Sequence, residues 1–312
     1  MIRKITITVL ALYIGINLSF ALKPHKEYYK TPENMGLVYR ELNVSTPDGY
    51  NIKTWFFPAQ ETVSSEVYMS YYRSTSPPKK EYQLQDSVPK PTIIVCDGDS
   101  YNMSASLRYV FEYVSKGYNV VTFDWRGFGE SSDFPINEDY LFYSEFLIDY
   151  QSVINYVNAL PEVKKDYLGL LGYSTGAYFS FAAAYNNASI KCVIGRGTMT
   201  NFDDFLKTLY KNYPEKRNRG ILVPNNYPIE LCPINIAEKQ DTPTMLIVGK
   251  HDKRTPVKMS KKIYRRLNVD KELWIAKDAG HGGIEAPETI HFQEFFTKTT
   301  NFYNRFLIYP GC

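Results

Sequence analysis

An alternation of short apolar runs with longer amphipathic runs, beginning near residue 90, constrains the fold of this 312-residue chain more than any other feature. The short runs have the length of buried strands, and the longer runs repeat apolar residues at helical spacing. This pattern is typical of βαβ units and predicts an α/β fold, with a mostly parallel sheet of roughly eight strands flanked by helices. The expected strands are 92–96, 119–123, 168–171, 192–194, 245–248 and 273–276, and the expected helices are 104–116, 141–160, 177–185, 257–267 and 289–306.

Three other segments depart from this alternation. Two β-rich runs, 38–46 and 50–58, are joined by the turn residues Pro47-Asp48-Gly49 and predict an antiparallel hairpin at the start of the domain. Segment 60–90 keeps no period of 2 or 3.6 and predicts a surface insertion. Segment 200–242 has aromatic residues at helical spacing and predicts a small cap. Its aromatic stripe either packs against the body or lines a substrate pocket.

The N-terminus predicts a targeting segment. Arg3 and Lys4 precede 18 uncharged residues that end at Leu22, and small residues precede a cleavage point after Ala21. We favour a secretory signal peptide over residues 1–21; an uncleaved N-terminal membrane anchor and a buried helix stay open. The signal and the anchor both predict an extracytoplasmic body, secreted or periplasmic.

Composition argues against several other classes of protein. Apolar residues make up 44% of the chain and charged residues 22%, which is ordinary globular usage rather than that of a disordered chain. The 36 Lys and Arg are spread among 33 Asp and Glu without a basic block, so no nucleic-acid partner is expected. Cys96 and Cys192 lie in apolar runs and are interpreted as small buried hydrophobes, while a Cys232–Cys312 disulfide stays open.

The sharpest chemical motif is Gly172-Tyr173-Ser174-Thr175-Gly176, a GxSxG between an expected strand and an expected helix. A strained turn in this position holds the serine hydroxyl exposed, and the flanking glycines leave room for the close approach of the chain. The motif therefore predicts Ser174 as a nucleophile.

A nucleophilic serine needs a base, and the chain has 4 histidines. His25 lies at the targeting boundary, His251 directly precedes an aspartate at a strand end, and His291 falls inside the last expected helix. His281 lies in a glycine-rich loop after the last expected strand, where the backbone can bring an imidazole over the serine. We therefore predict His281 as the base, and Asp252, just past another strand end, as the group that orients it.

The resulting chain order, Ser174, Asp252 and then His281, is that of α/β-hydrolases. Segment 117–131 contains an apolar strand followed by Arg-Gly-x-Gly-x-Ser, which is also similar to that superfamily. From about Val38 onward the chain resembles the α/β-hydrolase superfamily, in particular its serine esterase and peptidase-like members with small caps. The resemblance implies that residues 22–312 form one hydrolase domain.

The resemblance also implies an oxyanion hole, which requires amide donors aimed at the developing charge. The amide of Thr175 is expected to supply one, and by position the amide of Asp99, after strand 92–96, supplies the second. The superfamily usually has His-Gly-x in that loop, and Asp97 replaces the histidine here. We favour Asp97 as a brace for loop amides; the alternative is that these acids select a cationic substrate. For Arg126, we favour a structural role over substrate binding.

These residues predict an exported serine hydrolase that cleaves an acyl bond in a small molecule or peptide through an acyl-enzyme. Carboxylic esters come first, then peptides or amides, and a serine nucleophile argues against dehalogenases and epoxide hydrolases. An acyltransferase on the same triad and a non-catalytic binding protein on a hydrolase scaffold stay open. No metal, nucleotide or flavin is expected, because no His/Cys cluster has ligand spacing and Gly172–Gly176 is not a GxGxxG.

Overall fold

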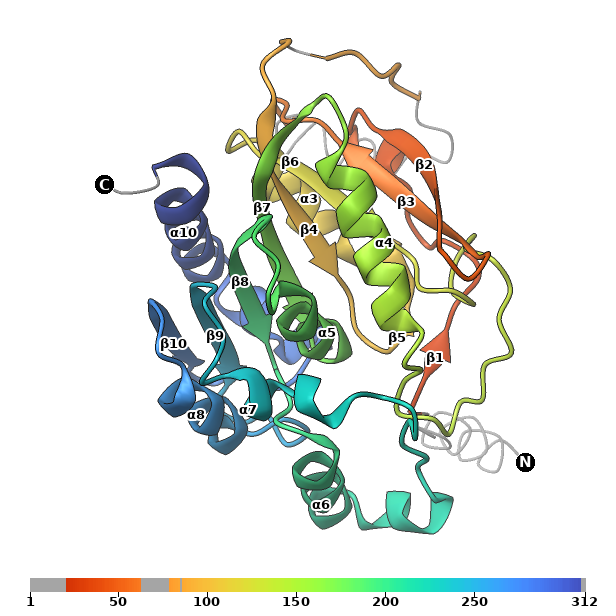
Figure 1. Cartoon of the computed structure of the whole chain (residues 1–312), viewed down its shortest axis with the longest axis vertical. Coiled ribbons are helices and arrows are strands. Elements are labelled where there is room, and N and C mark those ends of the chain that lie inside the picture. Colours follow the sequence, from red (N-terminus) through yellow and green to blue (C-terminus); the bar gives the residue numbers. More distant parts are fainter. Residues whose placement is uncertain (1–20, 63–78, 85, 310–312) are drawn as a thin grey trace, which may run out of the picture.

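The computed structural model describes residues 21–62, 79–84 and 86–309. An eight-stranded sheet lies at its centre, in the order β10-β9-β8-β7-β4-β6-β3-β2 (Figure 1). Neighbouring strands are parallel except for β2–β3 and β3–β6, so the predicted mostly parallel sheet is confirmed. The strands are β2 Arg40–Ser45, β3 Asn51–Phe57, β4 Lys90–Cys96, β6 Asn119–Phe123, β7 Val163–Tyr173, β8 Ile190–Arg196, β9 Thr244–Gly249 and β10 Lys271–Ala276.

The predicted N-terminal hairpin is also confirmed, because β2 and β3 pair antiparallel across the Pro47-Asp48-Gly49 turn. Gly49 has φ +91°, a backbone conformation that favours glycine. A separate pair of short parallel strands joins β1 (Lys23–Pro24) to β5 (Ser100–Tyr101). This pair ties the start of the described chain to the loop that follows β4.

Helices cover both faces of the sheet (Figure 1). One face carries α4 Phe146–Asn158, α5 Thr175–Ala184, α7 Pro233–Ile236 and α8 Val257–Arg266; the other carries α3 Leu107–Val114 and α10 Phe292–Tyr303. Every residue of α5 is buried, since this helix lies between the sheet and other helices. On the opposite face, Tyr113 of α3 packs edge-on against Tyr303 of α10, with ring centroids 5.6 Å apart. The resulting layers bury the apolar runs on which the prediction rests.

Two helix predictions need correction. The predicted helix 289–306 is interrupted, because α9 (Pro287–Ile290) ends at His291, whose φ of −121° and ψ of 50° are not helical. His291 instead uses its ring to donate a hydrogen bond to the carbonyl of Lys277. The predicted helix 141–160 begins later, at Phe146, because the amide of Leu141 donates to the carbonyl of Leu222.

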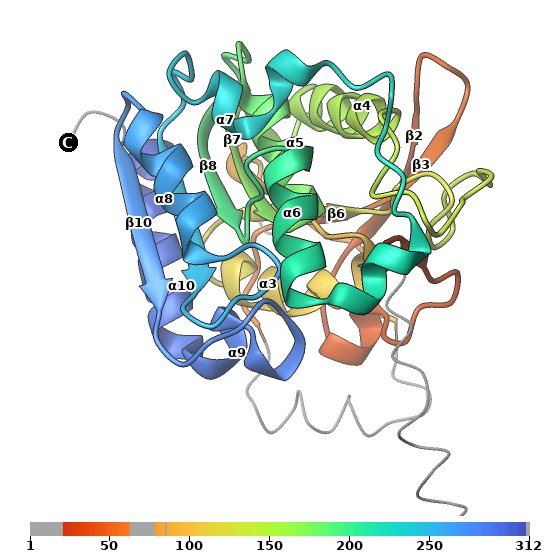
Figure 2. The ribbon, with the colours of Figure 1, turned by 90° about the horizontal axis from the view of Figure 1, so that it is seen from below.

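The cap segment stands at the carboxyl ends of the parallel strands (Figure 2). It contains α6 (Phe202–Asn212), a short helix at Pro214–Arg219, a second short helix at Ile229–Leu231, and then α7. Its Phe202 stacks on Tyr178 of α5, with ring centroids 5.7 Å apart, and Phe205 is buried in the same core. These members of the aromatic stripe pack against the body.

Several predictions fall on residues outside the described ranges. They are the targeting segment 1–21, apart from Ala21, most of the insertion 60–90, and Cys312. Cys232 is buried, and its Sγ lies 3.0 Å from Tyr178 Oη. Over the described ranges, no helix is both long enough and apolar enough to cross a bilayer.

Candidate active site

Ser174 occupies a strained turn between β7 and α5. Its φ of 52° and ψ of −113° lie outside the ordinary regions for a residue with a side chain, and its amide donates to the Arg196 carbonyl at 2.8 Å. A Cβ at Gly172 would lie 2.5 Å from Ala177 Cα, and one at Gly176 would lie 2.0 Å from the Cys96 carbonyl oxygen. The two glycines are therefore required by close backbone contacts, as the motif predicts.

The structure brings the three predicted site residues together. His281 Nε2 lies 3.1 Å from Ser174 Oγ, and His281 Nδ1 lies 2.7 Å from Asp252 Oδ2. Each residue follows the carboxyl end of its own parallel strand, β7, β9 or β10, so residues far apart in sequence meet at one edge of the sheet. An imidazole in this arrangement can accept the serine proton while its other nitrogen stays hydrogen bonded to the carboxylate.

Asp252 is held by its own loop. The amides of Arg254 and Thr255 each donate to Oδ1 at 2.8 Å, and Thr255 Oγ1 donates to Oδ2 at 2.9 Å. Burial by itself raises the pKa of Asp252, but the charge and hydrogen bond of His281, with the bonds from Thr255, outweigh burial and lower that pKa below its ordinary value. Asp252 therefore stays ionised and fixes the orientation of the imidazole.

The two predicted oxyanion donors have free amides. Within the described part of the chain, neither the Thr175 nor the Asp99 amide donates to a protein acceptor. Thr175 is the first residue of α5, where the helix dipole favours a negative charge. The contact between Gly176 and the Cys96 carbonyl packs the start of α5 against the loop that carries Asp99. Among the described residues, both amides therefore keep their hydrogens for another acceptor.

The carboxyl groups of that loop are engaged elsewhere. Asp97 accepts from the Gly98 amide at 2.8 Å and from Ser106 Oγ at 3.0 Å, as a brace for the loop would. Burial raises the pKa of Asp97, and these hydrogen bonds offset only part of the rise. Asp99 pairs with Arg254, Oδ2 to Nη2, at 3.3 Å. The hydrogen bonds that Asp97 accepts and the ion pair of Asp99 with Arg254 weaken the opposition of these carboxyl groups to an oxyanion.

Comparisons with known proteins agree with this architecture. The sequence profile of the prolyl oligopeptidase family matches residues 105–307. The chain belongs to this family. It is 29% identical over 246 residues to the uncharacterized protein YfhR of Escherichia coli, covering 77% of this chain and 72% of that protein. It is 26% identical over 218 residues to the uncharacterized protein YqkD of Bacillus subtilis, covering 65% of this chain and 68% of that protein.

Solved structures place this family member among the α/β-hydrolases. The Pyrococcus furiosus esterase Pf2001 superposes with a TM-score of 0.67 at 19% identity, over 92% of this chain and 100% of that one. A puromycin-hydrolyzing peptidase of Mycobacterium tuberculosis superposes with a TM-score of 0.62 at 14% identity, over 90% of this chain and 41% of that one. The family and the shared fold make the chain an α/β-hydrolase.

Sequence analysis missed a buried ion pair that holds the His281 loop of this hydrolase. Arg196, at the end of β8, donates from Nη1 to the His281 carbonyl at 2.6 Å, and its Nη2 pairs with Glu288 Oε1 at 2.9 Å. Its guanidinium also lies 3.5 Å from the centre of the Tyr173 ring. Glu288 is fully buried and accepts from Tyr109 Oη at 2.8 Å as well. The pair therefore fixes the backbone on which the imidazole is carried.

Arg126 has the structural role that sequence analysis favoured. It is fully buried, and its guanidinium pairs with Asp149 and with Asp48, each at 2.6 Å. It also covers the Tyr50 ring at 4.1 Å. All of these contacts lie within the fold.

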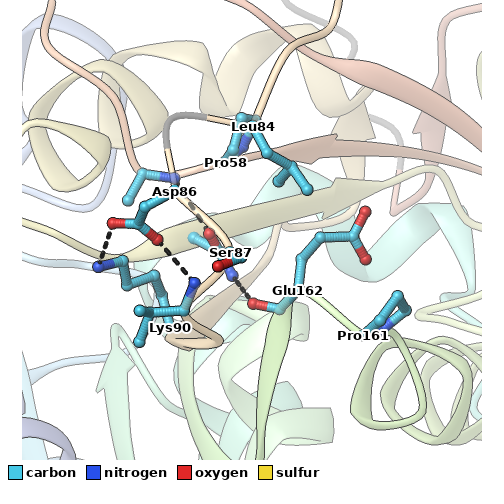
Figure 3. Close-up of a pocket in the computed structure, with 10 residues that line it drawn as sticks. Pro58, Leu84, Asp86, Ser87, Lys90, Pro161 and Glu162 are labelled. Atoms are coloured by element: carbon cyan, nitrogen blue, oxygen red, sulfur yellow. Dashed lines mark hydrogen bonds and ion pairs between the residues drawn. The ribbon is translucent and has the colours of Figure 1, made fainter.

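A hollow at the other end of the sheet is separate from this site (Figure 3). It has a volume of about 280 Å³ and lies where β4 and β7 begin, next to Lys90 and Glu162. Its lining includes Leu84, Ser87 and Val88 but no histidine. Leu84 and residues 86–88 of the predicted insertion therefore border this hollow, at the amino ends of the strands. The described chain contains no cluster of three His, Cys, Asp or Glu side chains that could hold a metal ion.

Proposed function

We propose that this protein is a serine hydrolase in which Ser174 attacks an acyl carbonyl, His281 takes the serine proton, and Asp252 holds the imidazolium. The observation that carries the proposal is the continuous hydrogen-bonded path from Ser174 Oγ through His281 to Asp252, with distances of 3.1 and 2.7 Å. A serine, a histidine and a carboxylate that are hydrogen bonded in this order perform acyl transfer on several unrelated folds. The strained turn at Ser174 supports the same role, because such strain gathers at functional sites.

The reaction has two balanced halves. In the first, the Ser174 oxygen bonds to the carbonyl carbon, the amides of Thr175 and Asp99 donate to the oxyanion, and His281 returns the proton to the leaving group. In the second, His281 removes a proton from water, the hydroxide oxygen attacks the acyl-enzyme, and Ser174 leaves with that proton. The product is a carboxylic acid, and the enzyme returns to its starting state.

Carboxylic esters are the first expected substrates, followed by peptides or amides. An alcohol leaves a tetrahedral intermediate more readily than an amine does, so the same site cleaves esters with less demand on His281 as an acid. Of two solved structures that share this fold, one is an esterase and the other is a puromycin-hydrolyzing peptidase. The proposal extends to an extracytoplasmic location, on the basis of the apolar run before Leu22.

Hydrolysis of p-nitrophenyl acetate and of the matching anilide by the purified full chain tests this proposal. Wild type should cleave the ester faster than the anilide, and Ser174→Ala and His281→Ala should cleave neither. Ser87→Ala, at the hollow of Figure 3, is the matched control and should equal wild type. Wild-type activity in folded Ser174→Ala would refute the proposal.

A further inference from the structure

We propose that the face of the molecule around the active site rests on the lipid bilayer that the N-terminal segment enters, and that the substrate is an acyl ester carried by a membrane-resident amphiphile. The inference rests on the proposed acyl hydrolase function and adds the substrate class. It is carried by the place at which the N-terminal segment joins the folded body and by exposed apolar side chains around that place.

The N-terminal segment joins the body beside the oxyanion loop. The amides of Ala21 and Leu22 both donate to the Glu138 carbonyl, at 2.9 and 3.1 Å, and the amide of Lys23 donates to the Asp99 carbonyl at 2.8 Å. Asp99 is the residue whose own amide is proposed to donate to the oxyanion. The apolar run that ends at Leu22 therefore meets the body within one hydrogen bond of the catalytic machinery.

The same contacts favour retention of the segment. Leu22 is fully buried, and Ala21 is 7% exposed. Cleavage after Ala21 would create a charged amino group on Leu22, and placing that charge in a buried position costs free energy. A continuous peptide chain through these residues carries no such charge. We therefore take the run that ends at Leu22 as the uncleaved anchor of the full chain. The 16 uncharged residues before Ala21 are left to enter the bilayer, which is slightly short of a usual span, and Arg3 and Lys4 can extend it by reaching the interface.

Exposed apolar side chains border the entry point on both sides. We call Tyr101, Leu222, Val223 and Ile284 the rim; their exposed fractions are 51%, 43%, 37% and 84%. Single exposed apolar residues are common on soluble proteins, so their exposure alone carries no argument. What distinguishes the rim is that its segments are linked by hydrogen bonds to the site or to the entry point.

On one side, the links run through the cap. Leu222 pairs with Tyr140 in an isolated bridge, and its carbonyl accepts from the Leu141 amide at 2.8 Å. These residues directly follow Glu138, the acceptor for Ala21 and Leu22. Leu222 is thus paired with the segment that directly follows the acceptor of the anchor's last residues, and Val223 is its neighbour in the chain.

On the other side, the links run through the oxyanion loop to the His281 loop. Tyr101 follows Asp99 and pairs through β5 with β1, which begins two residues after Ala21. Arg108, a few residues further along, donates to Thr289 Oγ1 at 3.0 Å, and Thr289 donates to the Gly283 carbonyl at 3.1 Å. Gly283 precedes Ile284, so the rim continues from the anchor to the loop that carries the catalytic base.

A bilayer accounts for the anchor junction and the exposed apolar rim better than a small soluble substrate does. An anchor that ends at Leu22 holds the Asp99 loop at the membrane surface, and tyrosine and aliphatic side chains at that level are stabilised in the interfacial region. Figure 2 looks onto this end of the molecule, with α6 of the cap toward the viewer. An acyl ester that leaves the bilayer here reaches Ser174 without crossing bulk water.

The first arm of the test measures contact with lipid and needs no catalytic activity. The full chain with Ser174→Ala and Cys312→Ser is reconstituted in vesicles of phosphatidylcholine and phosphatidylglycerol, with an NBD fluorophore on Ile284→Cys. The matched control carries the fluorophore on Val88→Cys, which is 60% exposed at the opposite end of the sheet. Native Cys96, Cys192 and Cys232 are buried.

The expected result is that spin-labelled lipids quench the fluorophore at Ile284 and leave the one at Val88 bright. Equal quenching at both positions, or no quenching at Ile284, would overturn the proposal. Shielding of Ile284 that persists in detergent without lipid and depends on protein concentration would also overturn it, in favour of a second copy of the chain or a protein partner on the rim.

The second arm measures activity. The double variant Ile284→Asp/Val223→Asp should lose about tenfold in the hydrolysis of a long-chain p-nitrophenyl ester embedded in the vesicles, because charges on the rim oppose its seating in lipid. Its kcat/KM for soluble p-nitrophenyl acetate should stay within about twofold of wild type. The control Leu84→Asp/Val88→Asp should change neither rate. An unchanged rate on the embedded ester would refute the docking claim. Absence of all ester cleavage by wild type would refute the proposed function, and the fluorescence arm would still decide the docking claim.

Discussion

The two ends of the parallel strands differ in a way that is useful for locating function. At the carboxyl ends, Ser174, His281 and Asp252 are hydrogen bonded together, and Ser174 is only 4% exposed. At the amino ends lies a hollow of about 280 Å³ that is lined by side chains such as Leu84 and Val88 and contains no histidine. One end has the linked reactive groups around a buried serine, and the other has an open hollow without such groups. The arrangement of reactive groups therefore locates the site better than the size of a hollow does.

The physical reason lies in the direction of the strands and helices. In a parallel α/β sheet the carboxyl ends of the strands lead into loops and helix N-termini, whose free amides attract negative charge. Thr175 at the start of α5 is such a terminus. The amino ends instead follow helix C-termini, such as that of α4, which ends at Asn158 before β7. Their free carbonyls do not stabilise an oxyanion.

The largest expected effect comes from removing the reacting groups. Ser174→Ala and His281→Ala should each lower kcat by roughly 10⁴- to 10⁶-fold, because nucleophile and base act as one unit. Steady-state ester hydrolysis measures the loss, and circular dichroism checks that each variant is folded. A folded variant with a tenth of wild-type activity would place the chemistry elsewhere.

Asp252→Asn comes next. The amide keeps the shape of the carboxylate, but its NH₂ group favours the wrong tautomer of His281, and kcat should fall by roughly 10³- to 10⁴-fold. The measurement is kcat for the same ester. A loss of less than tenfold would show that Asp252 contributes little beyond packing.

A smaller loss is expected from the buried pair that holds the His281 loop. Arg196→Met should lower kcat by roughly 10- to 100-fold with little change in KM, since it frees the His281 carbonyl without touching the substrate. It should also reduce the free energy of unfolding by about 1–3 kcal/mol, because the charge of the fully buried Glu288 loses its buried partner and keeps only Arg108, a partly exposed side chain, as a cationic partner. The double variant Arg196→Met/Glu288→Gln removes that charge and should recover part of the stability but not the kcat. Recovery of both would make the pair purely structural.

Two buried aspartates near the carboxyl ends should respond to pH with opposite sign. Burial raises the pKa of Asp124 to about 7, despite hydrogen bonds from Tyr28 and the Met103 amide, whereas the pKa of Asp252 is lowered. Folded protein therefore holds the Asp124 proton more tightly than unfolded protein does, and this contribution to stability is lost as pH rises from about 4 to about 7. The contribution of Asp252 is lost instead as pH falls below about 4.

Urea unfolding of wild type and Asp124→Asn between pH 4.5 and 8 measures the Asp124 effect. The free energy of unfolding of wild type, minus that of the variant, should decrease with rising pH up to about 7 and then level off. Each unit of pKa difference corresponds to ~1.4 kcal/mol. A difference that grows with pH would contradict the assignment.

The smallest effect is expected at the hollow. Leu84→Trp should fill part of it and change kcat/KM for soluble esters by less than about twofold, because surface substitutions away from a site have small effects. Ester kinetics measure this directly. A tenfold loss of kcat/KM would show that the hollow affects catalysis and would contradict the distinction between the two ends of the sheet.

Local sequence pattern is enough to predict most of the fold and the reacting groups. Strands such as β6, predicted at 119–123 and found at Asn119–Phe123, are buried apolar runs whose length is visible in the sequence. The elbow at Ser174 and the role of His281 also follow from local context, because Ser174 stands directly after β7 and His281 lies in the glycine-rich loop that follows β10.

Contacts between distant segments could not be predicted in this way. Arg196, Glu288 and Arg254 act through partners on other elements, and the local sequence offers at most the charge of Arg196 at the end of an apolar run as a sign. The break at His291 has the same origin, since the ring bonds to a carbonyl 14 residues earlier. The pairing of β1 with β5 joins residues 77 positions apart and leaves no periodic trace.

Mapping the covalent adduct of a fluorophosphonate on the full chain tests the central claim most directly. The reagent bonds only to an activated serine, and tandem mass spectrometry identifies the modified residue. The account predicts a single adduct on Ser174 that disappears in His281→Ala. An adduct on Ser87 at the hollow, or no adduct on folded wild type with the smallest reagents, would contradict it.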